Sequence, residues 1–250
     1  MPHMVLQAEE EAEFFVLPSP NEILSESEKL GLNVKITKEN SKILRTKFED
    51  LAKTDRLQAT YAMGRVFAVA GFSFSNLNNA VILAIAGKIF SGTKALKLPP
   101  AVNDEIVAQY QKMLKKPKWE REELMISFTA ARSSLMFLLK DSNKVLPEER
   151  TELEALATCI EMGIWYQSIY LALENLPAEK ISAFYELYMD EDVVNYFDKM
   201  LKHSMKKFPD SQFLKGLLDV NQACSRIMED DKLDAAELKN LKPLVQKVVQ

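Results

Sequence analysis

The residue types that most often carry out catalysis or bind metals are scarce in this sequence, which has 2 histidines among 250 residues. His3 lies in a short leading segment with the character of an expression remnant, so only His203 is left for such a function. No HExxH or ExxH spacing is present, which argues against a zinc protease and the usual di-iron bundle. Several lysines flank His203 and no carboxylate neighbour is evident to orient it, so we expect a basic surface and assign no catalytic residue and no metal ligand.

One glycine-containing segment superficially resembles a phosphate-binding loop. Gly87 and Gly92 have the spacing of that loop, but the two residues that follow are Thr93 and Lys94, in the reverse of the order the loop needs. The segment also follows a helical pattern, whereas a phosphate-binding loop follows a strand. We therefore expect no nucleotide site here and interpret Gly92 as the C-terminal cap of a helix.

Two acidic segments, 141–149 and 229–237, resemble half of a calcium-binding helix-loop-helix. If Glu237 is the last ligand of such a loop, Asp231 stands where the loop needs glycine, and Arg226 and Met228 stand where it needs oxygen ligands. The ligand set is incomplete. The segments are better interpreted as helix N-termini with acidic residues near the positive end of the helix dipole.

The two cysteines, Cys159 and Cys224, lie in predicted helices without a CxxC companion. They could form a disulfide if the protein is exported, provided that their Cα atoms come within about 7 Å of each other. Buried free thiols are the favoured interpretation, because a free cysteine behaves as a small apolar side chain.

The overall composition indicates a globular helical protein. Hydrophobic residues make up 47% of the chain and charged residues 27%, which is enough apolar material for a sizeable core. Only 7 glycines are present, too few for the many tight turns of a sheet protein. The net charge of −4 gives no reason to expect nucleic acid as a partner, and the basic clusters at 112–118 and 199–207 are interpreted as solvated helix faces.

The spacing of the apolar residues and the positions of proline and glycine predict helices and almost no strand. Pro20 stands at a first helical position and Gly31 at a C-terminal cap, while Thr37 and Asp55 are expected to cap the next two helices. The expected helices are 21–30, 37–52, 55–70, 77–90, 102–115, 118–139, 147–175, 178–189, 192–207, 211–228 and 235–249.

The stretch 66–87 has no charged residue and is long enough to cross a membrane. Its middle contains serines and asparagines, which are costly in hydrocarbon. We expect two buried antiparallel helices joined at 72–75 and no transmembrane span.

Aromatic and sulfur-containing residues are concentrated in and around 61–90 and 162–188. Such residues fill helical cores, and they can also line a pocket for an apolar ligand. In the segment 163–170 they form two adjoining faces, so we expect this helix to be central, with Gly163 allowing a close helix approach and with Arg65 or the asparagines at 76, 78 and 79 as partners of its tyrosine hydroxyls. The candidate ligand-binding residues are Tyr61, Arg65, Asn76, Asn79, Trp165, Tyr166 and Tyr170.

Three segments of the sequence resemble segments of other proteins: 17–31 with LPSPNEIL, 61–71 with Gly64, and 162–172 with MGIWYQSIYLA. In this order they resemble a group of uncharacterised exported all-helical proteins of Gram-negative bacteria, over about residues 15–176. The resemblance implies an all-α fold and export to the periplasm or cell surface, and it implies no activity.

We therefore expect an all-α protein with a single domain of about ten antiparallel helices, in one layer or two. Residues 1–18 are expected to be a remnant and a flexible segment, and 19–250 the helical domain, with an internal boundary near 97–100. The expected function is non-catalytic binding or scaffolding in the bacterial cell envelope, with a protein partner or a small apolar ligand and no cofactor. The alternatives are a carrier of a small hydrophobic ligand in an inter-helix cavity and, third, an enzyme. The cytoplasm is the alternative location.

Overall fold

In the computed structural model the described part of the chain is helical and contains no strand, which confirms the predicted all-α fold. The described residues are 17–18, 20–32, 34, 36–37, 40–73, 79–100, 103–104, 107–108, 111, 115, 135–137, 139, 146–174, 176–228 and 235–249. Within these ranges, the side chains at 21, 40, 73, 79–83, 86, 90, 147–148 and 235 are not described.

The helices occur in the expected order along the chain. They are α1 (Pro20–Lys29), the 3-10 helix η1 (Asn40–Arg45), α2 (Phe48–Thr54), α3 (Arg56–Ser73), α4 (Asn79–Ala95), α7 (Pro147–Glu174), the 3-10 helix η2 (Ala178–Lys180), α8 (Ile181–Tyr188), α9 (Glu191–Lys207), α10 (Gln212–Ile227) and α11 (Ala235–Val249). The predictions for 102–115 and 118–139, and those for 1–16 and the loop 229–234, lie wholly or largely outside the described residues.

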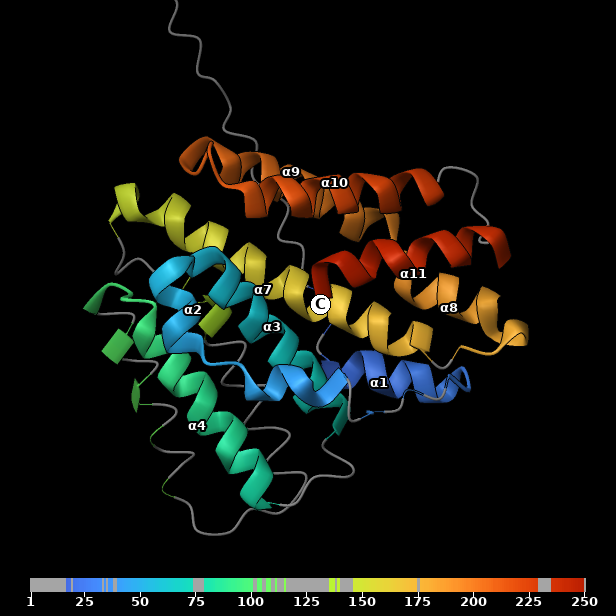
Figure 1. Cartoon of the computed structure of the whole chain (residues 1–250), viewed down its shortest axis with the longest axis horizontal. Helices are drawn as coiled ribbons and strands as arrows, with labels where there is room; N and C mark the ends of the chain where they lie inside the picture. Colours follow the sequence, from blue (N-terminus) through green and yellow to red (C-terminus); the bar gives the residue numbers. More distant parts are fainter. Residues whose placement is uncertain are drawn as a thin grey trace, which may run out of the picture.

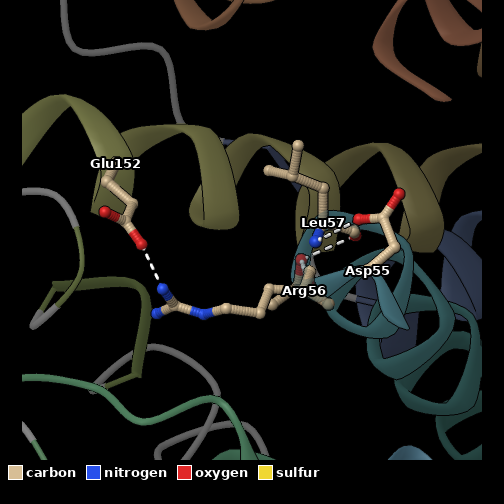
Figure 2. A network of polar contacts seen from close by, with 5 residues as sticks. Asp55, Arg56, Leu57 and Glu152 are labelled. Carbon is tan, nitrogen blue, oxygen red and sulfur yellow. Dashed lines mark hydrogen bonds and ion pairs between the residues drawn. The ribbon is translucent and has the colours of Figure 1, made fainter. Parts of the chain in front are cut away.

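Capping residues set several of these helix ends. The Asp55 side chain accepts hydrogen bonds from the main-chain N–H groups of Leu57 (2.9 Å) and Gln58 (3.1 Å), so it caps α3 as predicted (Figure 2). At the end of α1, Gly31 has a φ of 71°, and the N–H of Leu32 bonds back to the carbonyl of Ser27 at 2.7 Å. This left-handed cap confirms the expected end of the first helix.

The helices α3 and α7 form the centre of the molecule and make the most extensive contact between any two elements (Figure 1). Their backbones approach closely at two glycines. A Cβ atom at Gly64 would come closer than 3.0 Å to main-chain atoms of Ile160, and one at Gly163 would do the same to the carbonyl oxygen of Tyr61. The expectation of a close approach at Gly163 is thus confirmed, because no larger residue fits the crossing.

An ion pair also joins this central pair of helices near one end. The guanidinium group of Arg56 at the start of α3 reaches the carboxylate of Glu152 on α7 (Figure 2). Both side chains are partly exposed, so the pair adds little stability.

The remaining helices cover α3 and α7 on two sides. On one side α9 and α11 pack on α7, and α10 packs on both of them; on the other side α1, α2, η1 and α4 pack around α3 (Figure 1). The described buried side chains form one hydrophobic cluster that includes Leu96 and Leu98. The boundary near 97–100 and the antiparallel orientation of neighbouring helices stay predictions.

Three expectations about helix boundaries are wrong. The predicted helix 37–52 is divided into η1 and α2, because Lys47 is extended and re-aims the chain so that Phe48 is buried. Gly92 does not cap a helix but lies inside α4, where a Cβ atom would come within 2.9 Å of the Phe48 ring. The glycine therefore serves the packing of α4 on α2, and Gly71 likewise lies inside α3 and does not end it.

The long apolar stretch 66–87 includes parts of α3 and α4. Among the described residues, no helix is both long enough and apolar enough to span a membrane. The side chains of α3 from Val66 to Phe72 are buried in the protein core instead.

Candidate ligand-binding cavity

A cavity of about 980 Å³ opens between helices from both halves of the chain. Residues of α3 and α7 form its floor, and residues of η1, α2, α10 and α11 form its walls. The volume is at the upper end of the range of about 300–1,000 Å³ that small-molecule sites occupy. The cavity is partly open to solvent, because exposed residues are among those that line it.

The floor of the cavity is polar, although α3 and α7 are largely apolar helices. Its side chains include Tyr61 and Arg65 of α3 and Gln167 and Tyr170 of α7. All of these are buried except Arg65, which is partly buried. Helical spacing of about 3.6 residues per turn places Tyr61 and Arg65 on one face of α3, and Gln167 and Tyr170 on one face of α7.

Arg65 holds three helices together at this floor. Its Nε donates a hydrogen bond to the side-chain oxygen of Gln167 at 3.0 Å, and its Nη2 donates to the main-chain carbonyl of Val249 in the last turn of α11. A cation at a helix C-terminus interacts favourably with the negative end of the dipole and satisfies a carbonyl that has no partner within the helix. Burial lowers the pKa of Arg65, which the neighbouring hydroxyls of Tyr61 and Tyr170 partly oppose.

Tyr61 has a buried hydroxyl group with no hydrogen-bond partner among the described residues. Its ring packs edge-on against Phe213 of α10, with centroids 5.4 Å apart. Burial raises the pKa of this hydroxyl well above its usual value, while Arg65 acts in the opposite direction, so the group is a neutral donor. An unused buried donor is costly and unusual in a folded protein.

The walls are mainly apolar and the rim is polar. Apolar side chains from α2, α10 and α11 line the walls: Leu51, Phe213, Leu217, Val220, Leu244 and Val248. Exposed residues surround the opening: Lys42, Gln58, Gln212, Gly216, Asp219 and Lys247. A molecule entering the cavity would pass charged groups, then apolar walls, and would meet polar groups at the bottom.

Gly216 lies in the middle of the stripe of α10 that faces the cavity. The lining residues 212, 213, 216, 217, 219 and 220 follow helical spacing along one face. A Cβ atom at Gly216 would meet nothing within 4 Å, unlike one at Gly64 or Gly163. The absence of a side chain here widens the opening, and no described neighbour requires a glycine.

The seven candidate ligand-binding residues fall into three groups. Tyr61, Arg65 and Tyr170 line the cavity. Trp165 and Tyr166 are buried elsewhere in the core, at 3% and 1% exposure, so α7 is central as expected and these two side chains do not face the cavity. Asn76 lies outside the described residues; Asn79 begins α4, and its side chain is not described.

The buried Tyr166 hydroxyl has a different partner from those predicted. It donates to Asn221 Oδ1 of α10 at 2.8 Å, and Asn221 Nδ2 donates in turn to the carbonyl of Val194 on α9 at 2.9 Å. Arg65 instead bonds to Gln167 and Val249. The bond shows that α10 reaches this part of α7.

Sequence reasoning missed most of the cavity walls. Phe213, Gly216, Leu217 and Val220 of α10, together with the end of α11, come from segments remote from Tyr61 and Arg65 in sequence. The available signal was Gly216, a glycine in the interior of an amphipathic helix where alanine would be more stable.

The only histidine within the described residues, His203, has a carboxylate neighbour that the sequence did not suggest. Its Nε2 atom lies 3.2 Å from Glu154 Oε2, because α9 packs on α7. The expectation of a histidine without such a neighbour is wrong. His203 and Glu154 are both partly exposed, and neither lines the cavity.

Cys159 and Cys224 are buried free thiols in this structure, as expected. Among the described residues, no group of three or more histidine, cysteine or carboxylate side chains is arranged to hold a metal ion. The segment 87–94 lies within α4 and so has no loop that could cradle a phosphate. The cavity is therefore the strongest candidate site in the described part of the chain.

Comparisons of this chain with protein-family models, with curated proteins and with solved structures give no match.

Proposed function

We propose that this protein binds a small amphipathic molecule in the cavity between α3, α7, α10 and α11. The observation that carries the proposal is the combination of an open volume of about 980 Å³ with apolar walls and a polar floor. Small-molecule sites are typically concave, with apolar walls and a few convergent polar groups, so this geometry favours a binding function over a purely structural one. Among the functions considered, a carrier of a small ligand therefore fits this geometry better than a scaffold.

The lining groups are suited to binding. They supply hydrogen-bond donors, acceptors and apolar surface, and the deepest of them are held in place by contacts between different helices. Such preorganisation reduces the entropy lost when a ligand is fixed.

Gly216 provides a test that leaves the core untouched. In the variant Gly216→Phe the added ring enters the mouth of the cavity, whereas Gly216→Ala adds one methyl group in open space. We expect the neutral apolar dye N-phenyl-1-naphthylamine to bind the unmodified protein and Gly216→Ala with similar affinity, and Gly216→Phe about tenfold or more weaker, which corresponds to about 1.4 kcal/mol. Fluorescence titration measures all three.

Equal dye binding by Gly216→Phe and Gly216→Ala would contradict the proposal, because the dye would then bind outside the cavity. Unfolding curves of both variants serve as the control for folding.

The cell envelope is kept as the proposed location, on the resemblance in residues 15–176 alone. Fractionation of cells that produce the full protein tests it, and recovery in the cytoplasmic fraction would contradict it.

A further inference from the structure

The charges that line the cavity distinguish between classes of ligand. Arg65 at the floor and Lys42 and Lys247 at the rim are basic, and Asp219 at the rim is acidic. The basic groups are therefore in excess, and the single cation below the rim is Arg65. A ligand that reaches the floor meets a positive charge in a partly buried place, where electrostatic interactions are stronger than in water.

The described hydrogen bonds of Arg65 use two of its three guanidinium nitrogens, Nε and Nη2. A guanidinium has five N–H donors, and the described partners of Arg65 are two neutral oxygens, from Gln167 and Val249. Within the described residues Arg65 forms no ion pair with a carboxylate, and Asp219 lies on the exposed edge of α10. The positive charge at the floor is thus not neutralised by the described side chains.

A second and independent observation is the unpartnered hydroxyl of Tyr61. Tyr61 is 2% exposed, lines the same cavity, and lies one turn from Arg65 on the same face of α3. A carboxylate has two oxygens that can accept several hydrogen bonds, so it can bind a guanidinium and a phenolic hydroxyl at once.

We propose that the ligand is a single-chain amphipathic carboxylate, bound with its carboxylate at Arg65 and Tyr61 on the floor and with its apolar chain along the walls of α10 and α11. This inference rests on the proposed function of the cavity. The order of the lining groups supports this orientation, because the polar floor lies below apolar side chains such as Leu217 and Val248. A neutral or cationic molecule of the same length would leave the charge of Arg65 unpaired.

Decanoate is the probe, compared with decanol and decylamine by isothermal titration calorimetry at neutral pH, below the concentrations at which they form micelles. We expect decanoate to bind the unmodified protein about 10- to 100-fold more tightly than decanol, as for a hydrogen-bonded charged group. Decylamine is expected to bind more weakly than decanol.

Variants at the floor of the cavity, compared with a control variant outside it, locate the carboxylate. Arg65→Gln should lower the affinity for decanoate to that for decanol. Tyr61→Phe should weaken decanoate binding several-fold and leave the affinity for decanol unchanged. Lys239→Gln is the matched control, since it removes a positive charge from an exposed position of α11 that does not line the cavity, and it should change decanoate affinity by less than about twofold. If Arg65→Gln does not fold, Tyr61→Phe and the comparison of the three probes on the unmodified protein still decide the question.

The outcomes separate this inference from the proposed function. If the dye binds in the cavity but decanol binds as tightly as decanoate, the carboxylate assignment is overturned and the binding function stands. If decanoate binds tightly but Tyr61→Phe and Arg65→Gln leave its affinity unchanged, the proposed orientation is overturned. If neither the dye nor any probe binds, both the function and the ligand class are wrong.

Discussion

Replacing Gly163 by alanine should destabilise the protein markedly, although alanine is the better helix former. In an unhindered helix interior this change gains about 1 kcal/mol. Here the new methyl group would overlap the carbonyl oxygen of Tyr61 and lie 3.1 Å from the main-chain nitrogen of Arg65. Backbone atoms cannot rotate away as a side chain can, so α3 and α7 must separate along their most extensive contact.

Overpacking of a core costs about 1–3 kcal/mol, and a clash with backbone falls at or above the upper limit. After the gain in helix propensity is subtracted, we expect Gly163→Ala to lower the free energy of unfolding by about 2 kcal/mol. For a chain of this size that corresponds to a loss of about 4–8 °C in Tm. Urea denaturation followed by circular dichroism measures the change.

Gly216→Ala is the matched control, because it makes the same substitution in a helix where a Cβ atom has no neighbour within 4 Å. It should raise the free energy of unfolding by up to about 1 kcal/mol, so the two variants should differ by about 3 kcal/mol. If Gly163→Ala is as stable as the unmodified protein, the close crossing of α3 and α7 is refuted.

Further measurements test other parts of the structure. Trp165→Ala truncates a core side chain that packs near Tyr188 and should cost about 3–5 kcal/mol in urea denaturation; a cost below 1 kcal/mol would show that this part of α7 is not buried. Burial raises the pKa of the Cys224 thiol from 9.0 to about 12, so the unfolded chain loses this proton first, and the free energy of unfolding should fall as the pH rises from 9.0 to about 12. The contribution is at most about 1.4 kcal/mol per pH unit, and Cys224→Ala should show a correspondingly shallower fall. Calcium at millimolar concentration should leave Tm unchanged, because Asp231 and Glu237 belong to an incomplete ligand set; a rise of several degrees would show that a site exists there.

The order and type of the helices could be predicted because local chemistry determines them. Asp55 and Gly31 mark helix ends through hydrogen bonds and backbone conformations that depend on the residue itself. The close approach at Gly163 was predictable for a related reason, since a glycine between large apolar residues in a long helix has few other uses. The same logic failed at Gly92, where a glycine that could have ended a helix instead accommodates the Phe48 ring.

The candidate site could be predicted only in part. Tyr61, Arg65 and Tyr170 were identifiable as polar groups in apolar helices, which require partners wherever they are buried. Their partners could not be identified, because Arg65 meets Gln167 only where α3 crosses α7, and meets Val249 only after α11 packs on α7. Trp165 and Tyr166 are aromatic residues in the same apolar segments as the cavity residues, so the sequence alone does not distinguish them. Only the three-dimensional packing shows that these two side chains belong to the core.

Arg65 shows how the fold and the candidate site depend on each other. A charged side chain among apolar residues costs stability, and its two hydrogen bonds to neutral oxygens and its place at the end of α11 offset that cost in part. A hydrophobic residue of similar size would avoid the cost and could pack the same three helices together. The retention of a cation beside an open volume and beside an unused tyrosine hydroxyl therefore favours a role in binding an anionic group, because such a ligand would use the charge that the described protein groups leave unpaired.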